Sequence, residues 1–98
     1  MKINNIREAE KLTVAPTGRI DTLTAPVFEK TIGELLTGVS ELVLDMSKVD
    51  YVSSAGLRVI LKLQKIMSRQ GGMKLIGVNE SVMEVFEITG FSDILTIE

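Results

Sequence analysis

The chain has 98 residues, of which 45% are hydrophobic and 24% charged, a composition typical of one packed globular domain rather than two. Its formal net charge of −2 argues against a nucleic-acid-binding protein or a polybasic membrane-surface protein, since both usually carry a strongly basic patch. The absence of cysteine and histidine excludes thiolate chemistry, Ser-His-Asp and Cys-His arrangements, and the commonest metal ligand.

The first segment of the chain predicts a β-hairpin. Residues 3–8 are a weak strand candidate, and residues 12–15 alternate apolar and polar side chains more regularly, as a half-buried strand does. Pro16 has no N–H to donate to a neighbouring strand. We therefore expect the second strand to lie at an edge of the sheet or to end near this residue.

A first helix and a buried strand are expected next. Thr24 is a good N-cap, Pro26 suits the first helical turn, and Gly38 is a plausible stop. The expected inner face of this helix comprises Val27, Phe28, Ile32, Leu35 and Leu36. Residues 42–44 are an unbroken apolar run ended by Asp45, which is typical of a strand buried on both faces of a parallel sheet.

A second helix is predicted from Ser54, as its N-cap, to Gly71, and a strand over residues 73–78 follows it. The expected inner face comprises Leu57, Ile60, Leu61, Gln64 and Met67. Four basic residues recur at helical spacing on a different, outward stripe: Arg58, Lys62, Lys65 and Arg69. Such a stripe is usually a solvated helix face, but it can also dock an acidic partner, and both interpretations stay open.

A third helix and a short strand end the chain. Ser81 followed by Glu84 forms a capping box, Gly90 is a stop, and residues 94–97 predict a strand. The apolar stripe of this helix comprises Val82, Val85, Phe86 and Thr89. The order ββαβαβαβ predicts an α/β fold, a mixed sheet of about four or five strands with helices packed on it, as one domain over residues 1–98.

Functional surfaces of such sheets lie where the carboxyl end of a strand leads into the next helix. Two turns qualify, over residues 19–24 and 50–56, and the second opens its helix with Ser54 and small residues that leave the backbone N–H groups uncovered. A serine at this place is usually only a cap. A phosphate on Ser54, however, would meet the positive end of the helix dipole and would disrupt an interface that needs a neutral hydroxyl.

Acidic residues are the remaining candidates for chemistry. Asp21, Asp45 and Asp50 could gather near the strand ends and hold a divalent cation, yet Asp is common in turns, where it bonds its own backbone. The sequence contains no P-loop, no G-x-S-x-G elbow and no dinucleotide-binding glycine motif. We therefore expect neither enzyme activity nor a bound metal or cofactor.

Four segments carry a resemblance that covers nearly the whole chain. Residues 45–57 contain the run D-x-S-x-V-x-Y-V-x-S-A-G-L. The others are G-R-I-D over residues 18–21, G-G-M-K-L over residues 71–75 and F-E-I-T-G-F over residues 86–91. In this order they resemble the signature of the STAS domain family, and within it the small anti-sigma factor antagonists of bacteria.

The resemblance implies a switching mechanism. Such antagonists bind an anti-sigma factor that is also a serine kinase, and so release the sigma factor. The kinase phosphorylates the serine two residues before the motif glycine, and a PP2C-type phosphatase removes the phosphate. That serine corresponds to Ser54, with Ser53 as a less favoured acceptor. The expected partner surface comprises Asp21, Thr22, Asp45, Ser53, Ser54, Ala55, Gly56, Leu57 and Arg58.

The expected setting is the cytoplasm. No apolar run approaches the roughly 18–20 residues that span a membrane, and the first eight residues lack the apolar core of a signal peptide. We expect a monomer that binds neither nucleic acid nor membrane.

An alternative function stays open. Family members often carry Asp at the position of Ser53, so the chain can also be a non-switching STAS adaptor. Such a module would bind a transporter ATPase or a stress-signalling assembly, with Ser54 serving only as a helix cap.

Overall fold

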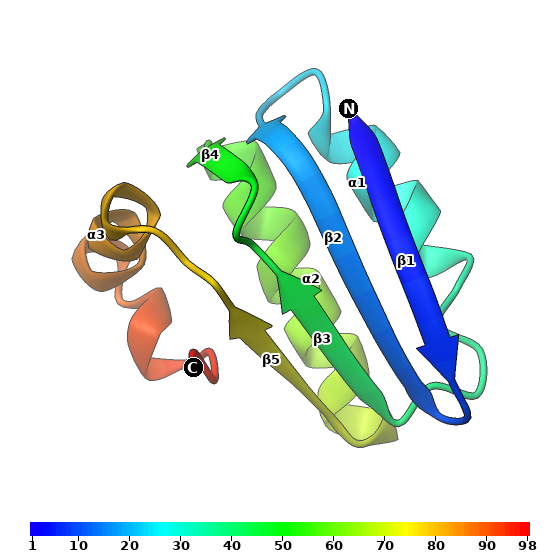
Figure 1. Ribbon diagram of the computed structural model, residues 1–98. Helices are drawn as coiled ribbons and strands as arrows, with labels where there is room; N and C mark the ends of the chain where they lie inside the picture. The colour runs from blue at the N-terminus through cyan, green and yellow to red at the C-terminus, as the bar shows by residue number, and fades with distance from the viewer.

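The computed structural model describes residues 1–98. Its elements, in chain order, are β1 (Lys2–Glu8), β2 (Lys11–Ile20), α1 (Ala25–Gly33), β3 (Glu41–Asp45), β4 (Val49–Val52), α2 (Ser54–Gln70), β5 (Gly72–Ile76), α3 (Glu80–Thr89) and a short 3-10 helix, η1 (Phe91–Asp93). Figure 1 shows that they form one twisted sheet with helices packed on it. The predicted fold class, a mixed sheet with packed helices, is confirmed.

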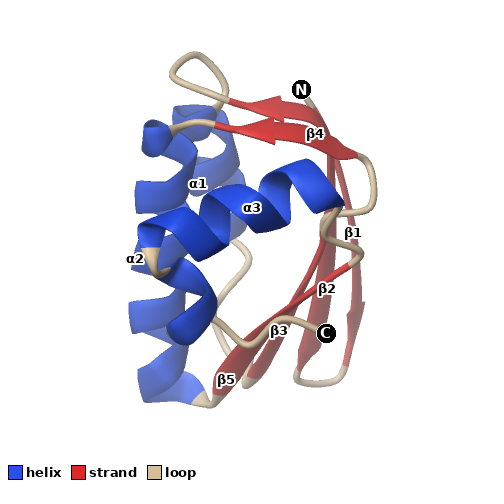
Figure 2. Cartoon of the chain, turned by 90° about the vertical axis from the view of Figure 1, so that its left-hand side faces the viewer, coloured by secondary structure: helices blue, strands red, loops and turns tan.

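The sheet is mixed and ordered β1-β2-β3-β5. β1 is antiparallel to β2, whereas β2, β3 and β5 run parallel. β4 is also parallel to β2 and continues the sheet beyond the end of β3. Parallel neighbours need a crossover connection, and α1 and α2 supply these crossovers on the same face of the sheet (Figure 2).

Pro16 lies inside the sheet, so the prediction of an edge or a strand end at this residue is wrong. β2 has ten residues and lies between β1 on one side and β3 and β4 on the other. Its pairing with β3 ends at Val14, and its pairing with β4 begins at Gly18. The Gly18 N–H donates to the carbonyl of Lys48, and Pro16, two residues earlier, faces the same side. The missing N–H of Pro16 therefore falls between the hydrogen bonds of β2 with β3 and those of β2 with β4, where no partner strand needs it.

Two segments differ from the predicted strands. Residues 49–52, expected as part of a loop, form β4. The two end residues of this strand are buried and the two middle ones are exposed, so its sequence lacks the alternation of apolar and polar residues that indicates a strand. Residues 94–97, expected as a strand, make a single bridge between Ile97 and Leu75, because the chain first turns through η1. Leu95 in this segment is nevertheless buried in the core.

The helix ends also differ from the predicted ones. α1 ends at Gly33, before the predicted stop at Gly38, so Leu35 and Leu36 lie in the turn that follows the helix. Asn79, rather than Ser81, caps α3, since its Oδ1 accepts the N–H of Val82 at 2.9 Å. Gly90 ends α3 in the left-handed conformation (φ 80°), as predicted.

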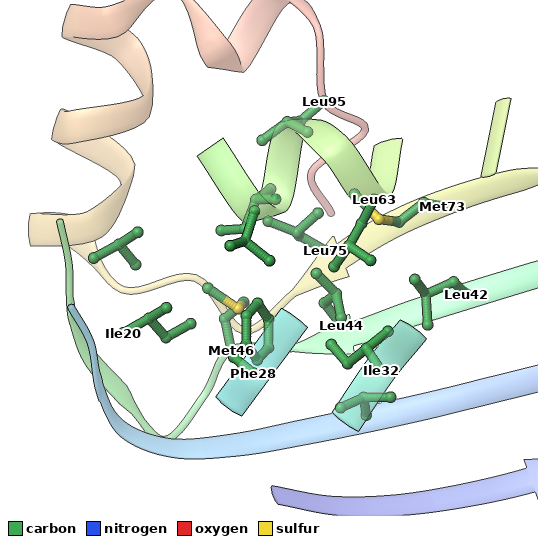
Figure 3. Packing of buried hydrophobic residues seen from close by; sticks show 14 of the residues in the cluster. Ile20, Phe28, Ile32, Leu42, Leu44, Met46, Leu63, Met73, Leu75 and Leu95 are labelled. Carbon is green, nitrogen blue, oxygen red and sulfur yellow. The ribbon is translucent and has the colours of Figure 1, made fainter. Parts of the chain in front are cut away.

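The core fills the space between the sheet and its helices. Figure 3 shows how side chains of the helices and strands meet there, including Phe28 and Ile32 of α1, Leu44 of β3, Leu63 of α2 and Leu75 of β5. Each of these five side chains is at most 1% exposed. Their contact fixes α1 and α2 against the sheet, and with them the loops at the sheet's carboxyl edge.

Some predicted core positions are turned away from this core. The buried residues of α2 are Gly56, Leu57, Val59, Ile60, Leu63 and Met67. Leu61 and Gln64, which were expected among them, are only half-buried, so the inner face is rotated. Val27 of α1 is 52% exposed, and Thr89 of α3 is also exposed. Among the helices, none is both long and apolar enough to cross a membrane.

Removing one methyl group from the core tests this packing. We expect Ile32→Val to lower the free energy of unfolding by about 0.5–1.5 kcal/mol, because the side chain is fully buried. Ile88→Val is the matched control, since it makes the same change on a helical residue that is 84% exposed and should stay within about 0.5 kcal/mol of the wild type. Urea unfolding followed by circular dichroism measures both, and equal losses would contradict the assignment of the core.

Candidate partner-binding site at the start of α2

The ends of β2 and β4 lie side by side and bring two loops together. Ile20, the last residue of β2, pairs with Val52, the last residue of β4. The N–H of Ser53 then donates to the carbonyl of Ile20 at 2.8 Å. The turn after β2 and the first turn of α2 therefore share one edge of the sheet, as the strand ends in Figure 1 show.

Ser53 is the N-cap of α2, so the prediction that Ser54 is the cap is wrong by one residue. Ser53 has an extended backbone (φ −85°, ψ 176°), and its Oγ accepts the N–H of Gly56 at 3.3 Å. Its carbonyl accepts the N–H of Leu57 at 2.9 Å, which starts the helical ladder. Ser53 takes this place because β4 runs directly into α2, which leaves one extended residue between them.

Ser54 is consequently the first residue of α2 and has no capping function. Its side chain is exposed. Its hydroxyl forms no hydrogen bond within the chain, and the backbone N–H groups of Ser54 and Ala55 donate to no acceptor. An exposed hydroxyl beside free N–H groups at the positive end of a helix is a place where an anionic group is favoured.

Gly56 allows α2 to approach the ends of both strands. A Cβ atom at this position would lie 2.8 Å from the carbonyl oxygen and the Cγ2 of Ile20, and 2.9 Å from the Cγ1 of Val52. These distances are shorter than any ordinary contact, and one of the atoms belongs to the backbone, which cannot move aside cheaply. Leu57 beside it is buried in the core, whereas Arg58 is exposed and one turn beyond Ser54.

The turn after β2 is built around the carboxylate of Asp21. Its Oδ1 accepts the N–H groups of Leu23 and Thr24 at 3.0 and 3.1 Å, and its Oδ2 lies 3.6 Å from Nε of Arg19. The hydrogen bond from the Thr24 backbone N–H is the main cause that lowers the pKa of Asp21 below its ordinary value, and desolvation opposes it. Asp21 thus has a structural function in this turn, and Thr22 beside it is exposed.

Asp45 is not brought next to Ser54. It ends β3, and its Oδ1 accepts the N–H of Ser47 at 3.1 Å, as a turn-forming Asp does. Figure 1 shows the end of β3 apart from the start of α2, with β4 between them. The suggested gathering of Asp21, Asp45 and Asp50 does not form either, since no three acidic side chains lie close enough together to hold a metal ion.

Arg19 and Tyr51 belong to this edge although the sequence did not single them out. They are paired across β2 and β4, and the guanidinium carbon of Arg19 lies 4.3 Å from the centroid of the Tyr51 ring. This is the geometry of a cation–π contact. The contact depends on the pairing of β2 with β4, so no local sequence signal could have revealed it without that strand.

A matched pair of glycine substitutions tests the close approach at Gly56. We expect Gly56→Ala to lower the free energy of unfolding by about 1–3 kcal/mol, because the new Cβ overlaps Ile20 and Val52. Gly33→Ala, at a helical glycine with open space around it, should leave stability unchanged or raise it by up to about 1 kcal/mol. Urea titrations give both values, and a Gly56→Ala protein as stable as the wild type would show that α2 lies farther from the strands.

The lowered pKa of Asp21 predicts a pH dependence. Because the folded pKa lies below the unfolded value of about 3.9, the carboxylate stabilises the fold above that pH, and the contribution is lost as pH falls through the folded pKa. Asp21→Asn should therefore melt below the wild type at neutral pH, and the two melting temperatures should converge in acid. Asp50→Asn, at an exposed residue, is the control and should follow the wild type throughout. A gap between Asp21→Asn and the wild type that does not change with pH would contradict this account.

Comparison with known families and curated proteins gives consistent matches. The STAS domain family matches residues 2–98. The anti-sigma-B factor antagonist of Bacillus subtilis (strain 168) is 33% identical over 100 residues, which cover 99% of this chain and 92% of that protein. The anti-sigma-B factor antagonist of Listeria monocytogenes serovar 1/2a is 30% identical over 95 residues, which cover 94% of this chain and 82% of that protein.

Solved structures show the same fold. An anti-sigma factor antagonist from Mycobacterium paratuberculosis has a TM-score of 0.88 at 22% identity, covering 98% of this chain and 83% of the other. SpoIIAA in its unphosphorylated form has a TM-score of 0.84 at 14% identity, covering 99% and 88%. Bacillus SpoIIAA in its phosphorylated form has a TM-score of 0.75 at 13% identity, covering 99% and 91%. The family match over nearly all residues, together with these relatives, shows that the chain belongs to the STAS domain family.

Proposed function

We propose that this chain is an anti-sigma factor antagonist whose binding is switched off by phosphorylation of Ser54. It acts as one STAS domain in the cytoplasm, as a regulatory binding protein rather than an enzyme. Its partners are an anti-sigma factor that is also a serine kinase and a PP2C-type phosphatase. The observation that carries this proposal is the exposed Ser54 hydroxyl, free of any hydrogen bond, in a chain whose curated relatives are named anti-sigma-B factor antagonists.

The division between two neighbouring serines supports Ser54 as the acceptor. Ser53 is half-buried, and its Oγ is used in capping α2, so a phosphate on it would remove a hydrogen bond of the fold. Ser54 can carry a phosphate without losing any hydrogen bond. Because Ser53 supplies the cap, Ser54 does not have the capping role that the alternative of a non-switching adaptor gave it.

The phosphate changes the interface far more than it changes the fold. At the start of α2 it meets two free N–H groups and the helix dipole, a contact worth about 0.3–2 kcal/mol in favour of the folded state. It also replaces a neutral hydroxyl with about −1.5 to −2 charge units. A partner surface that closes over a neutral hydroxyl must then desolvate a dianion, so binding is lost while the fold persists.

Intact mass spectrometry after incubation with the anti-sigma factor and ATP tests the acceptor. The wild type and Ser53→Ala should each gain one phosphate, and Ser54→Ala should gain none. Ser53→Ala should in addition lower the free energy of unfolding by about 0.5–2 kcal/mol, because it removes the N-cap. A full mass gain in Ser54→Ala would contradict the assignment.

The same variants, used as bait, identify the partner and test the switch. Ser54→Ala keeps a small neutral side chain and should capture the anti-sigma factor, whereas Ser54→Asp should lose it at an almost unchanged melting temperature. Capture of a transporter subunit by both variants would instead indicate the non-switching adaptor.

A further inference from the structure

Ser54 lies at one end of a row of basic residues on α2. Arg58, Lys62, Lys65 and Arg69, here called the basic stripe, follow Ser54 at intervals of four, four, three and four residues. At about 100° per residue these five side chains fall within an arc of about 80°, and at about 1.5 Å per residue they extend over roughly 22 Å. All five are exposed, as the sequence predicted for the outward stripe.

Most of the positive charge of the basic stripe is not neutralised within the chain. Lys62 forms an ion pair with Glu29 of α1, but Arg58, Lys65 and Arg69 form none. The chain as a whole carries more acidic than basic residues, with 13 against 11. The basic stripe is therefore a local excess of positive charge on an acidic protein, and an acidic surface is the complement that such a stripe attracts.

The far half of the basic stripe borders a hollow in the surface. The hollow has a volume of about 300 Å³ and is lined by Lys62, Lys65, Ile66, Arg69 and Gln70. Ile66 is half-buried and is the one hydrophobic residue of the lining. Nε2 of Gln70 donates to the carbonyls of Leu36 and Val39 at 3.0 and 2.8 Å, which holds this wall in place. An apolar spot among three cations suits a protein segment that carries both acidic and apolar side chains.

We propose that the anti-sigma factor that covers Ser54 also lies along the basic stripe and presents an acidic face to it. The proposal rests on the proposed function, because Ser54 fixes one end of the contact. An acidic partner face would also strengthen the switch. Phosphorylation places a dianion at the head of the stripe, where the acidic face of the partner would approach, so the two repel each other. If the partner face were neutral, desolvation of the phosphate would be the only cost that phosphorylation adds to binding, with no charge repulsion.

A charge reversal far from Ser54 tests the basic stripe. The probe is the anti-sigma factor identified with the Ser54→Ala bait. The variant combines Lys65→Glu and Arg69→Glu, at residues that lie about three and about four turns beyond Ser54. At low ionic strength we expect its association rate to fall by about tenfold or more, and the salt dependence of that rate to weaken. Both side chains are exposed, so the melting temperature should remain that of the wild type.

A matched control and a second variant separate the possible outcomes. Lys2→Glu combined with Lys11→Glu makes the same change of net charge on exposed residues of β1 and β2, and should associate within about twofold of the wild-type rate. Wild-type association of the Lys65→Glu and Arg69→Glu protein, or an equal loss in the control, overturns the role of the stripe. Ser54→Asp measured in parallel shows whether the proposed function itself fails, since that variant leaves the stripe intact.

Discussion

The hydrogen bond from the Ser53 N–H to the Ile20 carbonyl joins the end of β2 to the start of α2, and the candidate site depends on this junction. The bond forms because β4 pairs with β2 in parallel and delivers Ser53 beside the last residue of β2. Gly56 then lets the helix pack against Ile20 and Val52 without a side chain between them. If the helix stood farther from the strands, the first turn of α2 would no longer lie beside the Asp21 turn.

The two serines at this junction differ in what they contribute to the fold. Ser53 uses its backbone and its hydroxyl to start the helix, and Ser54 uses neither its hydroxyl nor its N–H. A protein of this size is stabilised by about 5–15 kcal/mol in total, so a modification at Ser54 that removes no contact leaves the fold intact. In the proposed function, the same modification would act on a partner at close range. Under the proposed function, this difference between the two serines would let a covalent change control binding without a change of structure.

The surroundings of Ser54 are preformed rather than loose. Asp21 holds its turn through two backbone N–H groups, and Arg19 spans from that carboxylate to the ring of Tyr51. A surface that is ordered before binding loses little conformational entropy when a partner arrives. If the partner presents an acidic face, as we propose, the basic stripe would add long-range attraction to this short-range fit, since charges attract a partner before the surfaces touch.

The local order of apolar, charged and glycine residues was enough to predict much of the secondary structure. The apolar run at residues 42–44 indicated a buried strand, helical spacing placed the basic stripe on the outside of α2, and Gly90 marked the end of α3. These features depend on interactions within a few residues, which the order of side chains already determines. The family motif pointed to Ser54 for the same reason, because it is read along one continuous segment.

Tertiary structure alone decided which residues share the site. The strand pairing between β2 and β4 made Ser53 the cap, placed Pro16 between two ladders and stacked Arg19 on Tyr51. It also set the end of β3, where Asp45 lies, apart from the start of α2 (Figure 1). Each of these outcomes depends on hydrogen bonds between segments about 30 residues apart, whose register is set by packing of the whole sheet and not by any local preference. The sequence by itself determined the helix that carries Ser54 and its charges, and the sheet determined what lies next to it.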